Sequence, residues 1–156
     1  MSSQRTPQAS LPGSVLYTCN LNAVRSPIAE ALTKHLYGKR FFAESAGLEP
    51  AERDPFAMIV MKEIGIDMAQ DHPLAIEAID IGAFDLVITM TPESYERVLE
   101  LTKAQAVDVE FWPTRDPFAA GEIGSREQRL MAYRQLRDEL HALLIQRFGP
   151  RDITEQ

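Results

Sequence analysis

Only one cysteine, Cys19, occurs in the 156-residue chain. A single thiol can form no disulfide within the chain and cannot build a cysteine-rich zinc site. Long apolar runs are also missing, since no stretch approaches the ~20 apolar residues that a membrane-spanning helix needs. The polar segment 1–13 lacks the apolar centre of a secretory signal. We therefore expect a cytoplasmic protein with no membrane partner, in a reducing compartment where a free thiol stays free.

Positive charge is also scarce, with 16 Lys and Arg against 23 Asp and Glu and a net charge of −7. Non-specific nucleic-acid binding depends on clustered basic side chains, so we expect no nucleic-acid partner. An apolar fraction of 45% with 25% charged residues is typical of a globular protein with its own core. The length suits one domain. We predict a flexible tail at 1–13, a single α/β domain at 14–150 and a C-terminal tail at 151–156.

Short apolar runs alternate with amphipathic segments along the chain. The apolar runs predict strands, which we place at residues 15–19, 40–45, 84–89 and 106–112. The amphipathic segments predict helices, which we place at residues 27–37, 55–64, 73–79, 92–101 and 126–148. Strands separated by helices imply a parallel sheet with both faces covered. We predict a three-layer α/β sandwich with a four-stranded parallel sheet in the order 2-1-3-4.

The most informative segment is the turn CNLNAVRSP, residues 19–27, between the first predicted strand and the first predicted helix. Ligands of α/β sheets bind beyond the carboxyl ends of the strands, and Cys19 falls at such an end. The free N–H groups of the following turn and helix start favour an anion. Arg25 adds a planar guanidinium that can bind two phosphate oxygens together. A thiol nucleophile and an oxyanion site in one turn indicate a phosphate-handling enzyme.

The same positive field should act on the thiol. A cysteine pKa near ~8.5 can fall to roughly 3.5–7.5 beside a helix N-terminus or a cation, so we expect Cys19 to be largely thiolate at neutral pH. The competing interpretation is that a lone cysteine is a small buried hydrophobe. Because Ser26, Pro27 and the strand-to-helix context accompany the Cys–Arg spacing, we favour the functional interpretation.

The chain resembles the low-molecular-weight protein tyrosine phosphatases from about residue 15 to residue 148. The resemblance rests on the turn CNLNAVRSP and on ESAG at 44–47, DP at 54–55, FDLVI at 84–88 and DPF at 116–118. It implies hydrolysis of phosphoric monoesters through a phosphocysteine intermediate, without a metal or organic cofactor. Cys19 would be the nucleophile and Arg25 would hold the equatorial oxygens. Asp116 would protonate the leaving group and then activate water.

The resemblance also implies a set of substrate-binding and supporting residues. Substrate would contact the rest of the turn and one aromatic residue beside the acid: Asn20, Leu21, Asn22, Ala23, Val24, Ser26 and Phe118. Ser26 would hydrogen-bond the thiolate. Asn22 would fix the shape of the turn, since Asn tolerates left-handed backbone angles, and Ser45 would brace Asn22.

Two Asp-Pro dipeptides compete for the role of the acid. Asp54 precedes a predicted helix and is explained as its N-cap, with Pro55 at the first helical position. Asp116 follows a predicted strand, on the side of the sheet where Cys19 should lie. We therefore assign the acid to Asp116.

Three departures from the family pattern concern the shape of the turn, the protection of Cys19 from over-oxidation and the grip on an aryl substrate, in that order. Leu21 stands where the family has Gly, Val24 where a second cysteine is common, and residues 48–53 contain no aromatic side chain. The expected partners are a phosphorylated protein or a small aryl phosphate, with inorganic phosphate or another oxyanion as product or inhibitor. Two alternatives stay open: an arsenate reductase that uses glutathione-type external thiols, and a non-catalytic phosphate-binding regulatory module.

Overall fold

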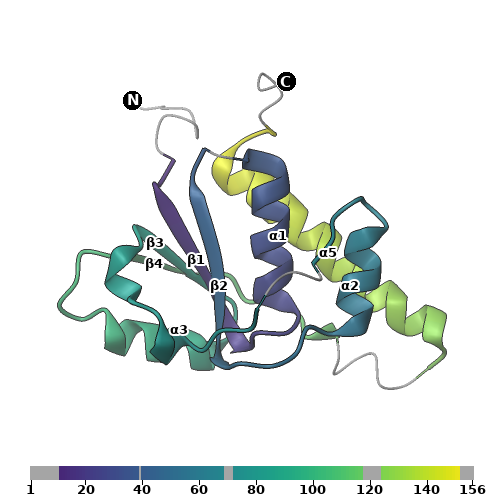
Figure 1. Ribbon diagram of the computed structural model, residues 1–156, viewed down its shortest axis with the longest axis horizontal. Helices are drawn as coiled ribbons and strands as arrows, with labels where there is room; N and C mark the ends of the chain where they lie inside the picture. Colours follow the sequence, from purple (N-terminus) through teal and green to yellow (C-terminus); the bar gives the residue numbers. More distant parts are fainter. Residues whose placement is uncertain (1–10, 39, 69–71, 118–123, 152–156) are drawn as a thin grey trace.

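A computed structural model describes residues 11–38, 40–68, 72–117 and 124–151. Its centre is a four-stranded parallel sheet in the order β2-β1-β3-β4, which confirms the predicted order (Figure 1). The strands are β1 (Ser14–Leu21), β2 (Phe42–Glu49), β3 (Leu86–Thr89) and β4 (Asp108–Phe111). Parallel strands bring their carboxyl ends to one edge of the sheet, and β1 delivers the Cys–Arg turn to that edge.

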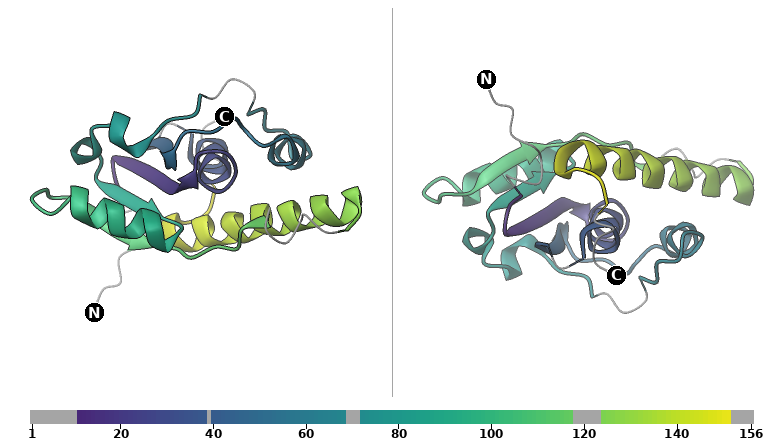
Figure 2. Two further views of the ribbon diagram at one scale, coloured as in Figure 1. Left: turned by 90° about the horizontal axis from the view of Figure 1, so that it is seen from below. Right: turned by 90° about the horizontal axis from the view of Figure 1, so that it is seen from above.

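Helices cover both faces of the sheet, as predicted for a three-layer sandwich. They are α1 (Arg25–Tyr37), α2 (Pro55–Lys62), α3 (Pro92–Leu101) and α5 (Arg126–Phe148). α1, α2 and α5 lie on one side of the sheet and α3 on the other (Figure 1). The amino-terminal half of α5 extends beyond the sheet, where it contacts α2 (Figure 2).

Two apolar cores flank the sheet. Val15 and Tyr17 of β1 belong to the larger core with α1, α2 and α5, whereas Leu16 belongs to the core on the α3 side. Successive side chains of a strand point to opposite faces. Because both faces are covered, β1 is a continuous apolar run rather than an alternating one.

Most observed boundaries lie within two residues of the predicted ones, and three differences have a local structural cause. β2 begins and ends later than the predicted 40–45, because its pairing with β1 continues to Glu49. α2 ends at Lys62 rather than residue 64, shortly before Gly65 with its φ of 86°. The predicted helix at 73–79 is only a 3₁₀ turn at Ile76–Ala78. The helix predicted at 126–148 agrees with α5, and the structure shows Ser125 as its N-cap.

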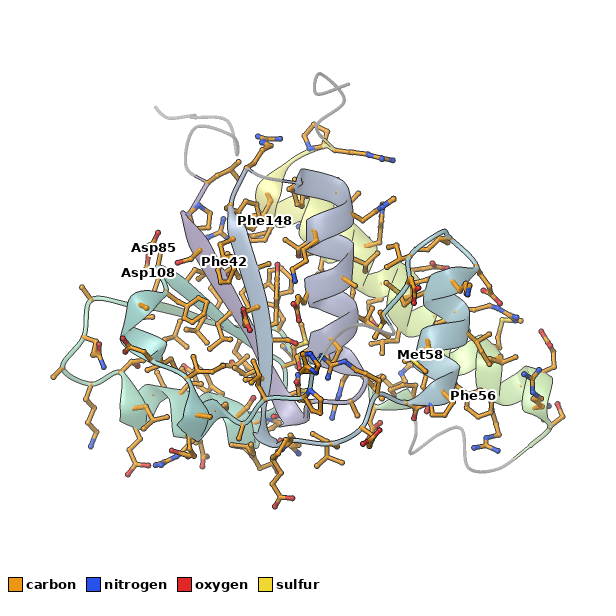
Figure 3. The ribbon with its side chains drawn as sticks, in the orientation of Figure 1. Phe42, Phe56, Met58, Asp85, Asp108 and Phe148 are labelled. Atoms are coloured by element: carbon orange, nitrogen blue, oxygen red, sulfur yellow. The ribbon has the colours of Figure 1, made fainter. Side chains whose placement is uncertain are left out.

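The turn between β1 and α1 lies at the carboxyl ends of the strands. Asp85 and Asp108 mark the opposite end of the sheet, because they lie where β3 and β4 begin (Figure 3).

Among the described residues, no helix combines the length and the apolarity that a bilayer crossing requires. The division of the chain into two tails and a domain stays a prediction.

Candidate active site

The turn between β1 and α1 surrounds the sulfur of Cys19. This side chain is only 1% exposed. The N–H of Ser26, in the first turn of α1, donates to Sγ at 3.4 Å, and Oγ of Ser26 lies 3.0 Å from Sγ. The amino terminus of α1 therefore faces the sulfur, which is the arrangement that favours a negative charge there.

Asn22 organises the polar groups behind the sulfur. Its Nδ2 donates to Ser26 Oγ at 3.0 Å and to Ser45 Oγ at 3.1 Å, so Ser45 does contact Asn22 as expected. Ser45 in turn donates to the buried carboxylate of Glu30 at 2.6 Å. Ser26 Oγ accepts from Asn22, and its own proton can go to the Cys19 sulfur at 3.0 Å or to the Ala46 carbonyl at 3.4 Å.

The backbone at Leu21 does not form the expected ring of inward N–H groups. Sγ of Cys19 donates to the carbonyl oxygen of Leu21 at 2.9 Å, and Ala23 N–H donates to the same oxygen at 2.7 Å. Asn22 N–H points away, to the Glu49 carbonyl at 3.2 Å. No described residue other than glycine has a positive φ. The left-handed conformation expected for Asn22 is therefore wrong for this state of the loop.

The expected thiolate is also wrong for this state. Burial raises the pKa of the Cys19 thiol above its ordinary value, and the Ser26 hydroxyl and N–H and the Arg25 charge offset only part of that rise. Desolvation disfavours the charged form of any acid, and here it outweighs the field of the helix terminus. The hydrogen bond to the Leu21 carbonyl also needs the protonated thiol.

We expect this raised pKa to make the stability of the protein fall above about pH 8.5. The unfolded chain loses the thiol proton near that pH while the folded protein keeps it, so the unfolded state binds fewer protons and gains stability. Urea unfolding at pH 7.5 and 9.5 checks this against Cys19→Ser. Between pH 7.5 and 9.5 the free energy of unfolding of wild type should fall by about 1 kcal/mol more than that of the variant. Equal losses would contradict the raised pKa.

A cleft of about 550 Å³ opens over the turn. It is lined by the turn, by the segment before α2 and by the predicted acid: Asn20, Leu21, Ala23, Val24, Arg25, Ala51, Glu52, Arg53, Asp54, Pro55 and Asp116. None of these described lining residues is aromatic. Cys19 itself is buried and is not part of this lining.

Arg25 and Asp116 share the cleft, as the sequence predicted. The Arg25 guanidinium also donates to the carbonyl of Thr114 at 3.1 Å, two residues before Asp116. This contact ties the turn to the segment that carries the acid. Phe118, the predicted aromatic contact, lies outside the described residues.

Asp54 lines the same cleft but both of its oxygens are engaged. Oδ1 accepts the Phe56 N–H at 2.8 Å, which confirms the predicted N-cap, and Oδ2 accepts the Tyr133 hydroxyl at 2.9 Å. The Phe56 ring, at the start of α2 in Figure 3, lies 5.5 Å from the Tyr133 ring. Asp54 thus connects α2 to α5, and both of its carboxylate oxygens serve this structural role.

The other predicted contacts in the turn, Asn20, Leu21, Ala23 and Val24, all line the cleft, and Leu21 is 52% exposed. The side chain of Asn20 is turned to α3, where its Oδ1 accepts from Thr91 at 2.7 Å, and Val24 packs against the larger core. Sequence reasoning missed Arg53, which bonds Asn22, because an arginine before an Asp-Pro cap fits an ordinary solvated loop.

The sequence model of the low molecular weight phosphotyrosine protein phosphatase family matches residues 14–147. The chain belongs to this family. An arsenate reductase of Shouchella clausii is 31% identical over 128 residues, which cover 82% of this chain and 89% of that relative. Members of the low molecular weight phosphatase family thus include enzymes named for two different reactions.

Solved structures of this family share the fold. The tyrosine phosphatase amsI of Erwinia amylovora superposes with a TM-score of 0.71 at 22% identity, covering 91% of this chain and 97% of that one. An arsenate reductase in its phosphate-binding state gives a TM-score of 0.66 at 26% identity, covering 85% and 97%. The chain is therefore similar to low molecular weight phosphatases and to arsenate reductases.

Proposed function

We propose that the protein hydrolyses phosphoric monoesters through a phosphocysteine on Cys19. The observation that supports this best is the setting of Sγ, which faces the Ser26 hydroxyl and N–H at the start of α1, in the turn that lines one cleft with Asp116. These groups can activate a thiolate, bind phosphate oxygens and supply a proton. We place the activity in the cytoplasm, because a lone thiol nucleophile has no second cysteine to protect it from over-oxidation.

In the first step the Cys19 thiolate attacks phosphorus and the ester P–O bond breaks. Asp116, in its protonated form, donates its proton to the departing oxygen. Arg25 and the N–H groups of the turn hold the remaining phosphate oxygens. The Ser26 hydroxyl donates to the sulfur and stabilises the thiolate before attack.

In the second step water attacks the phosphocysteine. The Asp116 carboxylate takes a proton from that water, the P–S bond breaks, and inorganic phosphate leaves. The thiolate of Cys19 is restored, and the Ser26 hydroxyl stabilises it as a leaving group. The cycle needs no redox partner.

The Leu21 carbonyl must leave the sulfur before a phosphate can approach. Rotation of the Leu21–Asn22 peptide turns that oxygen away and brings Asn22 N–H inward, with loss of the 3.2 Å bond to Glu49. This rotation gives Asn22 a positive φ, a conformation that Asn adopts more readily than most residues. The observed loop is then a resting state, in which burial keeps the pKa of the Cys19 thiol raised.

Leu21→Gly should bind inorganic vanadate more tightly than wild type, by about three- to tenfold. Glycine has no Cβ to restrict the peptide rotation, so the binding-competent loop is populated more often. Competitive inhibition or calorimetry gives the affinity. Leu21→Ala is the matched control, because it removes the bulk of the side chain but keeps the Cβ. Equal gains in both variants, or no gain with glycine, would contradict the rotation.

The described cleft favours a general monoester hydrolase over a dedicated phosphotyrosine enzyme. Aromatic walls favour a flat ring, and the described lining has none. The first test is turnover of p-nitrophenyl phosphate by the purified protein, followed by phosphotyrosine and phosphoserine peptides. We expect hydrolysis of the aryl phosphate. Tight phosphate or vanadate binding without any turnover would instead indicate a regulatory module.

Arsenate reduction is the second candidate, supported by the 31% identity to a relative named arsenate reductase. The Cys19 sulfur would bond to arsenic as one arsenate oxygen leaves as water, and an external thiol such as glutathione would then attack that sulfur and displace arsenite as Cys19 enters a mixed disulfide. A second external thiol would release Cys19, which balances the two electrons. Glutathione-dependent arsenite formation faster than ester hydrolysis would favour this candidate.

A further inference from the structure

Two consecutive carbonyl groups of the turn are held from outside by two consecutive residues of the segment before α2. Arg53 Nη1 donates to the carbonyl oxygen of Asn22 at 2.5 Å and to its side-chain Oδ1 at 3.1 Å. The N–H of Asp54 donates to the carbonyl of Ala23 at 3.2 Å. The second guanidinium nitrogen of Arg53 reaches the carbonyl of His72 at 3.4 Å.

These contacts fix which way the N–H groups of the turn point. In a trans peptide the carbonyl and the following N–H point in opposite directions, and the described residues contain no cis peptide bond. An outward Asn22 carbonyl therefore sends Ala23 N–H inward. The structure agrees, because Ala23 N–H donates to the same Leu21 oxygen that accepts from the Cys19 sulfur.

The side chain of Asn22 depends on the same guanidinium. Its Oδ1 accepts from Arg53 and from Leu74 N–H at 2.9 Å, while its Nδ2 serves Ser26 and Ser45. Both amide atoms are thus committed, and Asn22 Nδ2 holds the Ser26 hydroxyl that lies 3.0 Å from the sulfur. Arg53 supports both the amide that faces the cleft and the hydroxyl that faces the thiol.

The charge of Arg53 strengthens this support. A guanidinium keeps its charge at any physiological pH, and hydrogen bonds from a charged donor are stronger than neutral ones. Hydrogen bonds in series polarise one another, so a cation on the Asn22 carbonyl makes Ala23 N–H a better donor. Arg53 lines the cleft itself, in a chain whose net charge of −7 otherwise opposes anions.

We infer that Arg53 is a positioning residue of the oxyanion site, which orients the Asn22–Ala23 peptide toward a phosphate bound over Cys19 and holds the Asn22 side chain against Ser26. The inference rests on the proposed phosphatase site. Arg25 is the group that touches the oxygens of the substrate, whereas Arg53 acts through Asn22. Its loss should weaken oxyanion binding and thiol activation together.

Four proteins test this: wild type, Arg53→Met, Arg53→Lys and Arg97→Met. Methionine keeps an apolar stem, lysine keeps one cationic donor, and Arg97→Met removes the same charge from a surface ion pair with Glu77. The readouts are the vanadate dissociation constant, the melting temperature and the pH dependence of iodoacetamide alkylation. Because Cys19 is the only cysteine, alkylation reports on that thiol alone.

We expect Arg53→Met to weaken vanadate binding about ten- to a hundredfold, the effect of losing a charged hydrogen bond, and to shift the alkylation profile to higher pH. The vanadate dissociation constant of Arg53→Lys should stay within about threefold of the wild-type value, and that of Arg97→Met should equal the wild-type value. If Arg53→Met fails to fold, the lysine variant decides, and a vanadate dissociation constant more than about threefold above that of wild type would then overturn the inference. Unchanged binding in Arg53→Met, or equal losses with methionine and lysine, would overturn the inference. Failure of wild type to bind vanadate would instead contradict the proposed function.

Discussion

Cys19→Ser should lower kcat for p-nitrophenyl phosphate by about 10⁴-fold or more, the scale seen when a covalent nucleophile is removed. A serine hydroxyl is far harder to ionise than a thiol, and the described site offers no base beside it comparable to those of serine hydrolases. Steady-state turnover of the purified variant measures the loss. Retention of more than a tenth of the wild-type rate would show that another group attacks phosphorus.

The fold and the oxyanion site of this variant can be checked separately. Ser26 N–H, Arg25 and the turn backbone are unchanged, so inorganic phosphate should bind within about threefold of wild type. The melting temperature at pH 7 should also stay close to that of wild type. If both hold, lost turnover is lost chemistry. If phosphate binding disappears as well, Cys19 would be needed for the shape of the site and the nucleophile assignment would lose its support.

Asp116→Ala should slow poor leaving groups far more than good ones. General acid catalysis contributes about 10²–10⁴-fold, so phenyl phosphate should lose roughly that factor. A leaving group such as p-nitrophenolate departs without a proton and should be slowed much less. The dependence of kcat/KM on the pKa of the leaving phenol measures the difference, and it should be steeper in the variant.

Asp54→Ala is the matched control for Asp116, since both precede a proline and both line the cleft. Loss of the N-cap and of the Tyr133 contact should destabilise the protein by about 1–2 kcal/mol. The slope against leaving-group pKa should stay that of wild type. A steeper slope for Asp54→Ala than for Asp116→Ala would transfer the acid role to Asp54.

The fold followed from local patterns wherever those patterns were strong. The buried run of β3, the Asp54-Pro55 start of α2 and the amphipathic α5 each carried a signal that tertiary packing did not override. The short helix predicted near Ile76 failed, because a few residues of helical composition do not secure more than one 3₁₀ turn.

The positions of the site residues were predictable, but the state of the loop was not. Spacing placed Cys19 and Arg25 in one turn, and topology brought Asp116 to the same edge of the sheet. The direction of the Leu21 carbonyl depends on single peptide orientations, which no sequence pattern specifies. The thiol pKa depends on burial against the helix field, and only the structure supplies that balance. Arg53 acts across 31 positions of sequence from Asn22, without a motif.

The most direct test of the central claim is to trap phosphate on the protein. Enzyme in excess is mixed with p-nitrophenyl phosphate, denatured within one turnover and digested, and the peptide that carries Cys19 is analysed by mass spectrometry. A phosphoryl group on Cys19 that forms with nitrophenolate release and decays with phosphate release is the predicted result. Nitrophenolate release with no phosphoryl group on Cys19 at any time, in a protein that binds phosphate, would contradict it.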